Sequence, residues 1–295
     1  ATVLLGIKGT KDALADKGYT DLLTVGGLVG DAKAQLDEEA LGIEGNSYVL
    51  TLGTDLLNGG SFNNKFIAFA DEEGKTLGQN DILNGKDGFD TLDFTIADSY
   101  SGNNGKYTID QFETKSVELV KFSARSDDEG FIDMRKVKQP VIIESYETEG
   151  ASLNFFDIQG LNETALRIID TDEDHTFYYD TNAFENGGEE NVLSLTLQEM
   201  RENSSEEAPV IEFLSELKAG PVESQIDVIN LNSQALLPLY NGLTPHNQNY
   251  LHDLRVGPDF ETFNIGGDAD LFIENFLDKN LNMVNAGDLI ADLRL

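Results

Sequence analysis

Residues 78–93 read GQNDILNGKDGFDTLD and contain two consecutive nine-residue units. Aspartate recurs after nine residues, at Asp81 and Asp90, and leucine recurs at the same interval, at Leu83 and Leu92. Glycines between them permit tight left-handed turns that direct backbone carbonyls inward. Carbonyl and carboxylate oxygens are the ligands that calcium prefers. The spacing therefore predicts stacked turns that present oxygens to Ca²⁺ while the leucines enter the core.

The second unit, residues 85–93, has the sequence GKDGFDTLD. It resembles the repeats-in-toxin calcium-binding nonapeptide, Gly-Gly-x-Gly-x-Asp-x-Leu-x. Gly85, Gly88 and Asp90 match this pattern, whereas Lys86 stands where the second glycine belongs. The resemblance implies that a calcium ion lies between successive turns on the same side of a roll.

An upstream segment, residues 50–66, is a weaker copy with the sequence LTLGTDLLNGGSFNNKF. In this copy Asp55 corresponds to Asp81, and Asn64 corresponds to Asp90 but offers a neutral oxygen, so weaker binding is expected. The resemblance would pair these residues between turns, although the insertion at 69–78 leaves the pairing open. The predicted calcium ligands are Asp55, Asn64, Gly78, Asp81, Gly85, Asp87, Gly88 and Asp90.

From Tyr48 onward the chain consists of short β-rich runs separated by Gly, Asn and Asp, which predicts a mainly β fold. The near-regular recurrence of turns favours a parallel β-helix or β-roll-like solenoid over a sandwich. Residues 1–45 have helix-compatible spacing and predict a short helical cap or linker, with the calcium-binding solenoid at 46–295. The acidic segment 197–220 predicts a small helical insertion, with helical spacing at 197–203 and 209–218.

The composition restricts the possible partners. The chain has 54 acidic and 20 basic residues and a formal net charge of -34, so it repels nucleic-acid phosphates and anionic lipids. No apolar run is long enough to span a membrane, so membrane insertion is not expected. Cysteine is absent, which restricts a metal site largely to oxygen ligands and hard cations.

The sequence contains neither of two common hydrolase motifs. The zinc-protease pattern H-E-x-x-H and the nucleophile pattern G-x-S-x-G do not occur, and the chain is expected not to be an enzyme. His175 is expected to be a hydrogen-bonded surface histidine rather than a catalytic one. Two alternating acidic groups are expected to be solvated, with calcium binding as the alternative; they are Asp170, Asp172 and Asp174, and Asp268 and Asp270.

Most of the segment 48–295 looks like the repeats-in-toxin class of bacterial surface-layer proteins and large adhesins, although only 51–93 is specific. The resemblance implies secretion without a cleaved N-terminal signal (type I), an extracellular place on the bacterial cell surface, calcium-triggered folding, and self-association into a lattice or fibre. Two alternatives remain open. One is a β-helix polysaccharide lyase or hydrolase, with Arg125, Arg135, Lys136 and Lys138 as basic candidates. The other is an adhesion module that binds cell-surface polysaccharide or a host ligand through Tyr178, Tyr179 and their neighbours.

Overall fold

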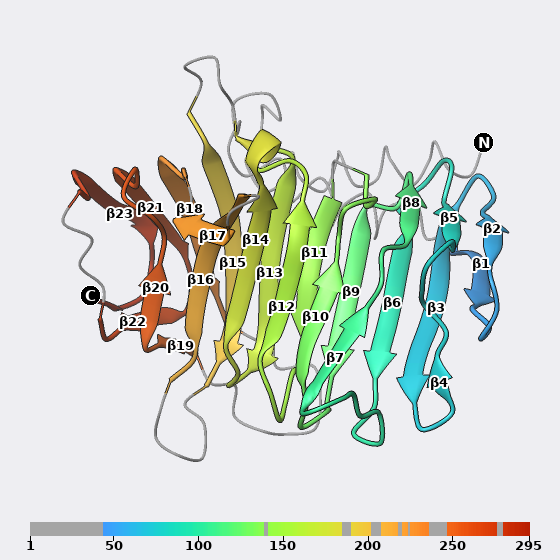
Figure 1. Cartoon of the computed structure of the whole chain (residues 1–295). Helices are drawn as coiled ribbons and strands as arrows, with labels where there is room; N and C mark the ends of the chain where they lie inside the picture. The colour runs from blue at the N-terminus through green and yellow to red at the C-terminus, as the bar shows by residue number, and fades with distance from the viewer. Residues whose placement is uncertain are drawn as a thin grey trace.

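The computed structural model shows β-strands wound into successive parallel coils (Figure 1). It describes residues 44–138, 141–184, 190–201, 208–217, 220–223, 225–235, 247–275 and 280–295. The helical segment predicted at 1–45 lies outside these ranges except for its last two residues, which belong to the first strand. The prediction of a mainly β chain with solenoid-like parallel sheets is confirmed.

Within the described residues, the largest sheet contains 11 strands and runs the length of the solenoid. All its neighbours are parallel except β4, which forms a hairpin with β3. In spatial order the sheet contains β1 (Glu44–Val49), β3 (Asn63–Asp71), β6 (Thr91–Ile96), β9 (Leu119–Ala124), β11 (Val141–Tyr146), β13 (Thr164–Thr171), β15 (Val192–Met200), β18 (Val228–Gln234), β21 (Thr262–Gly267) and β23 (Met283–Leu289), with β4 (Gly74–Lys75) beside β3.

Between strands of this main sheet, the chain passes through one or two of the smaller sheets found in the described ranges. The first contains β2 (Leu56–Asn58), β5 (Ile82–Asn84) and β8 (Glu113–Lys115). The second contains β7 (Lys106–Ile109), β10 (Glu129–Asp133), β12 (Leu153–Ile158), β14 (His175–Asp180) and β16 (Val210–Leu217), with β17 (Gly220–Glu223) and β20 (Asp253–Arg255) both paired to β16. The third contains β19 (Gln248–Leu251), β22 (Asp270–Ile273) and β24 (Leu293–Arg294).

The coils differ in length. Tyr48 lies opposite Phe66, 18 residues later, whereas Val192 lies opposite Val228, 36 residues later. In the described part of the chain, β4 and β17 take up extra residues by pairing antiparallel with β3 and β16, and they do not change which strands of the main sheet pair. The insertion at 69–78 is an example, because its tight β3–β4 hairpin returns the chain to the same coil.

Alternation of side chains produces the core. In β6, Leu92, Phe94 and Ile96 are fully buried and the residues between them are half-buried, as expected for strands whose successive side chains point to opposite faces. Aromatic rings from both kinds of sheet meet in one internal column. Neighbouring rings lie 5.1–5.9 Å apart between centroids, in the order Phe94, Phe122, Phe155, Phe177 and Phe213.

The helical insertion predicted at 197–220 is wrong for its described residues. Residues 197–200 complete strand β15, and residues 210–217 form strand β16. Ile211, Phe213 and Ser215 are buried in alternation, which is the period of a strand rather than of a helix. The only helical element among the described residues is the 3₁₀ turn η1 (Thr181–Ala183), and none of them forms a helix with the length and hydropathy to cross a bilayer.

Candidate metal-binding turns

The two predicted turns stack directly on each other. Strands β2 and β5 pair with Leu56 opposite Ile82, and β3 and β6 pair with Lys65 opposite Thr91. Both offsets are 26 residues, so Asp55 lies beside Asp81 and Asn64 lies beside Asp90. The structure therefore brings together the pairs that the resemblance implied.

Every carboxylate oxygen of Asp55 and Asp81 accepts at least one hydrogen bond. One carboxylate oxygen of Asp81 accepts from the backbone N–H of Asp55 and the other accepts from that of Gly78, each at 2.8 Å. Asp55 accepts from the backbone N–H of Thr51 at 2.8 Å and from the Thr51 hydroxyl at 3.2 Å. Burial raises the pKa of Asp81. The Asp81 carboxylate therefore joins two coils, whereas the Asp55 carboxylate is held locally by Thr51, and each of the four oxygens has a donor without a cation.

Asp90 is different because one of its oxygens has no partner. Its Oδ1 accepts from the backbone and side-chain nitrogens of Asn64, at 2.6 and 2.7 Å. Its Oδ2 is buried and makes no hydrogen bond with any described residue, and the whole side chain is 0% exposed. Burial raises the pKa of Asp90, because the buried position disfavours the charged carboxylate.

A second oxygen lies next to this unpaired atom. A methyl group on Gly85 would sit 2.1 Å from the Ser116 carbonyl oxygen and 2.2 Å from Asp90 Oδ2. Both oxygens therefore lie on the side of Gly85 from which a side chain would project. Oxygen ligands of this kind fit a hard cation such as Ca²⁺, and a buried polar atom without a partner calls for an explanation such as a bound ion.

The next coil continues the same column of side chains. Glu118, which lies opposite Asp90 and 28 residues later, accepts from the Asp90 backbone N–H at 2.7 Å through its Oε2. Burial raises the pKa of Glu118, and the negative charge of Asp90 adds to the effect. The nine-residue spacing did not identify Glu118, because the coil between the two residues is longer than the motif.

The turn itself keeps the geometry that the motif requires. Lys86, at the second glycine position, adopts a left-handed φ of 74°, and Gly88 has a φ of 123°. Asp87 and Gly88 are exposed. The charge of Asp87 contributes to raising the pKa of Asp90, but no contact places its carboxylate beside Oδ2.

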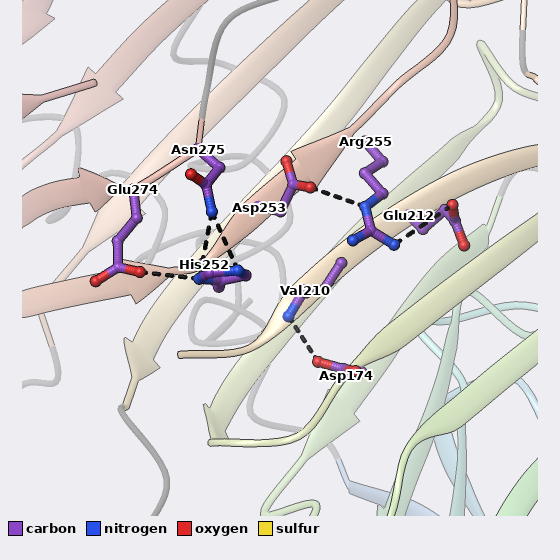
Figure 2. Close-up of polar contacts among 8 residues, drawn as sticks. All are labelled: Asp174, Val210, Glu212, His252, Asp253, Arg255, Glu274 and Asn275. Carbon is purple, nitrogen blue, oxygen red and sulfur yellow. Dashed lines mark hydrogen bonds and ion pairs between the residues drawn. The ribbon is translucent and has the colours of Figure 1, made fainter. Parts of the chain in front are cut away.

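Other acidic side chains also join coils through backbone N–H groups. Figure 2 shows Asp174 accepting from the backbone nitrogen of Val210, at 2.7 Å. Asp268 and Asp270 accept from the backbone nitrogens of Ala235 and Asp292 in the same way. Asp170 instead forms an ion pair with Arg201, at 2.7 Å. The alternating acidic groups are thus dispersed among separate contacts.

Further along the solenoid, a polar pocket of about 400 Å³ opens on the turns before β21 and β23. Strand register places Asp227 opposite Glu261 and Glu261 opposite Asn282. In the described ranges, no three His, Cys, Asp or Glu side chains are placed to hold a metal by themselves. The pocket is lined by Asp227, Pro258, Asp259, Glu261, Asn280 and Asn282.

His175 is not a surface residue, contrary to the sequence-based expectation. Alternation along β14 directs His175, Phe177 and Tyr179 into the core, and His175 is 0% exposed. Its Nδ1 donates to the Glu173 carbonyl at 2.9 Å, so Nε2 accepts from the Ser145 hydroxyl at 2.7 Å. Burial lowers the pKa of His175 to about 4. The ring is a neutral, hydrogen-bonded part of the core.

His175 is expected to make the protein labile in acid. Between pH 6.5 and about 4 the unfolded chain binds a proton at this residue and the folded chain does not. The free energy of unfolding should therefore fall as the pH drops through this window, by roughly 3 kcal/mol from this residue alone. His175→Gln should flatten the slope of urea-unfolding free energy against pH.

The control for this prediction is His252→Gln, because the ring of His252 is 42% exposed and contacts Glu274 at the surface. This variant should retain the wild-type slope. Equal slopes in the wild type and His175→Gln would show that the buried ring does not carry the acid response.

Comparisons with known proteins identified no similar protein. A scan against models of protein families and searches of curated proteins and of solved structures found no match to this chain. The residues and geometry of the chain itself are therefore the basis for a functional proposal.

Proposed function

We propose that the chain is a non-enzymatic structural module of a bacterial surface layer or large adhesin, which calcium stabilises outside the cell. The observation that carries this proposal is the unpaired, fully buried Oδ2 of Asp90 beside the Ser116 carbonyl, within a stack of parallel coils. The turn motif around Asp90 is the part of the sequence that most specifically resembles calcium-binding repeats.

Asp90 and the Ser116 carbonyl would hold the ion between adjacent coils. Calcium supplies positive charge there, which offsets the buried carboxylate and relieves its repulsion with Glu118. A ligand that binds the folded state and not the unfolded chain stabilises folding by mass action, by about 2.7 kcal/mol when its concentration is 100 times its dissociation constant. Low cytosolic calcium would leave the chain less stable before export.

The ends of the main sheet support self-association. In the described part of the chain, β1 pairs only with β3 and β23 pairs only with β21, so each has one edge without a strand. Unpaired strand edges favour pairing with another chain. Large apolar side chains are exposed near both ends; they include Val49, Leu52 and Leu56 near β1, and Met283, Val284 and Ile290 near β23.

The carbohydrate-binding alternative has less support from its named residues. Tyr179 is fully buried and cannot contact a ligand. Tyr178 is half-buried and stacks on Phe156 with centroids 4.2 Å apart and planes 9° apart, so one face of its ring is covered. This stacking removes one ring face from the surface that could contact a sugar.

The lyase alternative relied on a cluster of basic residues. Arg125 forms an ion pair with Glu147 at 2.7 Å, and Arg135 forms one with Asp157. Guanidinium groups held by carboxylates are less suited to acidify a sugar proton. Release of unsaturated sugar from polysaccharide would nevertheless establish this activity.

The proposal is tested by thermal unfolding in EDTA and in millimolar calcium, with light scattering of the same samples. The wild type should melt at a higher temperature in calcium and should associate. Asp90→Asn should lose most of the calcium-induced rise, because an amide at residue 90 can donate to the Ser116 carbonyl and leaves no unpaired carboxylate oxygen. Asp87→Asn, which removes an exposed charge from the same turn, should retain the rise.

Identical melting of the wild type in EDTA and in calcium would refute calcium stabilisation. A calcium-induced rise without any association would instead favour a monomeric binding module over a surface-layer component.

A further inference from the structure

The side-chain nitrogen of Asn64 is surrounded by oxygens. Its Nδ2 lies 2.5 Å from the Phe62 carbonyl oxygen, 2.7 Å from Asp90 Oδ1, 3.2 Å from the Gly85 carbonyl oxygen and 3.5 Å from the Gly60 carbonyl oxygen. An amide nitrogen carries only two hydrogens, so it cannot donate a full hydrogen bond to each of four acceptors. The side chain is 2% exposed, so solvent water has little access to donate hydrogen bonds to these oxygens.

The orientation of this amide is fixed by its other end. Asn64 Oδ1 accepts from the backbone nitrogens of Gly60 and Asn46, at 3.1 and 3.2 Å. Exchanging the oxygen and nitrogen would set an NH₂ group against two N–H donors and an oxygen against four oxygens. The partially positive NH₂ group therefore faces the oxygen cluster because the turn allows no other arrangement.

The next coil offers a direct comparison with a carboxylate at the same position. Asn64 and Asp90 are in register, and the backbone N–H of each donates to the side chain of the following coil. Gly59 and Gly85 donate in parallel fashion to Asn84 and Lys115, so the same turn recurs. Asn64 directs its NH₂ group to the Gly85 carbonyl, whereas Asp90 leaves Oδ2 unpaired beside the Ser116 carbonyl.

We propose that the Asn64 amide replaces a bound cation between its own turn and that of Asp90, so that this position is metal-independent and Asn64→Asp would convert it into a calcium site. A carboxylate at residue 64 would bring a fifth oxygen among the four that surround Nδ2. Without a positive charge between them these oxygens repel one another. Together they form the kind of oxygen-only ligand set that Ca²⁺ takes.

The inference rests on the proposed function in taking calcium as the cation, and it restricts that function. Calcium dependence of the wild-type turns would begin at Asp90 and the coil that follows it. The first turn would stay assembled without metal, giving the following coil a formed template on which to close around the ion.

The test compares the wild type, Asn64→Asp and Asn63→Asp in EDTA and in millimolar calcium, by thermal unfolding and by equilibrium dialysis with ⁴⁵Ca. Asn64→Asp should melt lower than the wild type in EDTA by roughly 5 °C or more, should recover in calcium, and should bind one more ion per chain. Asn63→Asp makes the same charge change one residue away, where Oδ1 only accepts from the Phe89 backbone nitrogen at 3.0 Å. It should bind no additional ion.

The outcomes separate this inference from the proposed function. The inference is overturned if Asn64→Asp melts like the wild type in EDTA, if calcium fails to restore it or to fold it, or if Asn63→Asp gains the same ion. A wild type that ignores calcium while Asn64→Asp gains a site would support the inference and refute the proposed function. A calcium-responsive wild type with no gain in Asn64→Asp would do the reverse.

Discussion

Phe177→Ala is expected to lower the free energy of unfolding by roughly 3–5 kcal/mol. Phe177 is 1% exposed and lies within the internal ring column, with Phe155 at 5.1 Å and Phe213 at 5.7 Å between centroids. Removing the ring leaves a cavity between rings of neighbouring coils, and the parallel strands that hold those rings cannot move together to fill it. Urea unfolding followed by circular dichroism measures the loss.

The matched control is Phe69→Ala. Phe69 belongs to β3 in the main sheet but is 41% exposed. Its removal should change the unfolding free energy by less than about 1 kcal/mol, since surface substitutions away from special features have small effects. Comparable losses for the two variants would contradict the assignment of the ring column as the core.

Gly85→Ala is expected to destabilise the fold by about 3 kcal/mol or more and to abolish the proposed calcium-induced stabilisation. The new methyl group would approach the Ser116 carbonyl oxygen to 2.1 Å and Asp90 Oδ2 to 2.2 Å. One of these is backbone and the other is a buried side chain, so relief requires separating two coils. The methyl group would also occupy the space in which the two oxygens converge.

Gly78→Ala provides the comparison in the same segment. A methyl group on Gly78 would meet no atom within 4 Å, and its backbone N–H to Asp81 would remain. Its melting temperature and calcium response should match the wild type. A similar loss in both variants would mean that chain flexibility, rather than close packing at Gly85, explains the effect.

The general fold was predictable because its signals are local. Runs such as TLDFTI alternate apolar and polar residues, and β6 buries them in that pattern. The prediction of a helical insertion at 197–220 followed from the helical propensity of its leucines and glutamates. It was wrong because packing of Phe213 in the ring column favours a strand. Tertiary packing thus prevailed over local propensity.

The site was predictable only where coil length repeats. The offset of 26 residues links Asp55 to Asp81 and Asn64 to Asp90, and both pairs were identifiable from the motif. Beyond Asp90 the offset varies, so Glu118 gave no periodic signal. The sequence also did not predict which end of the Asn64 amide points to the oxygen cluster. That orientation depends on the backbone N–H groups of Asn46 and Gly60, which donate to Asn64 Oδ1.

The acidity of the chain also has a structural component that composition does not reveal. Carboxylates at Asp81, Asp90, Glu118 and Asp268 each accept from a backbone N–H of a neighbouring coil. Charged acceptors form stronger hydrogen bonds than neutral ones. Part of the net charge of -34 is therefore tied to holding coils together rather than to solubility alone.

The parallel stacking of coils also determines how the molecule would respond to mechanical tension. Hydrogen bonds between neighbouring strands of the main sheet point from β1 toward β23, along the line that joins the first coil to the last. A pull applied between these two ends loads the interfaces between coils in series, so the weakest interface would open first and the coils would separate in steps. Such a solenoid would extend in stages under tension and would not lose its whole fold at once.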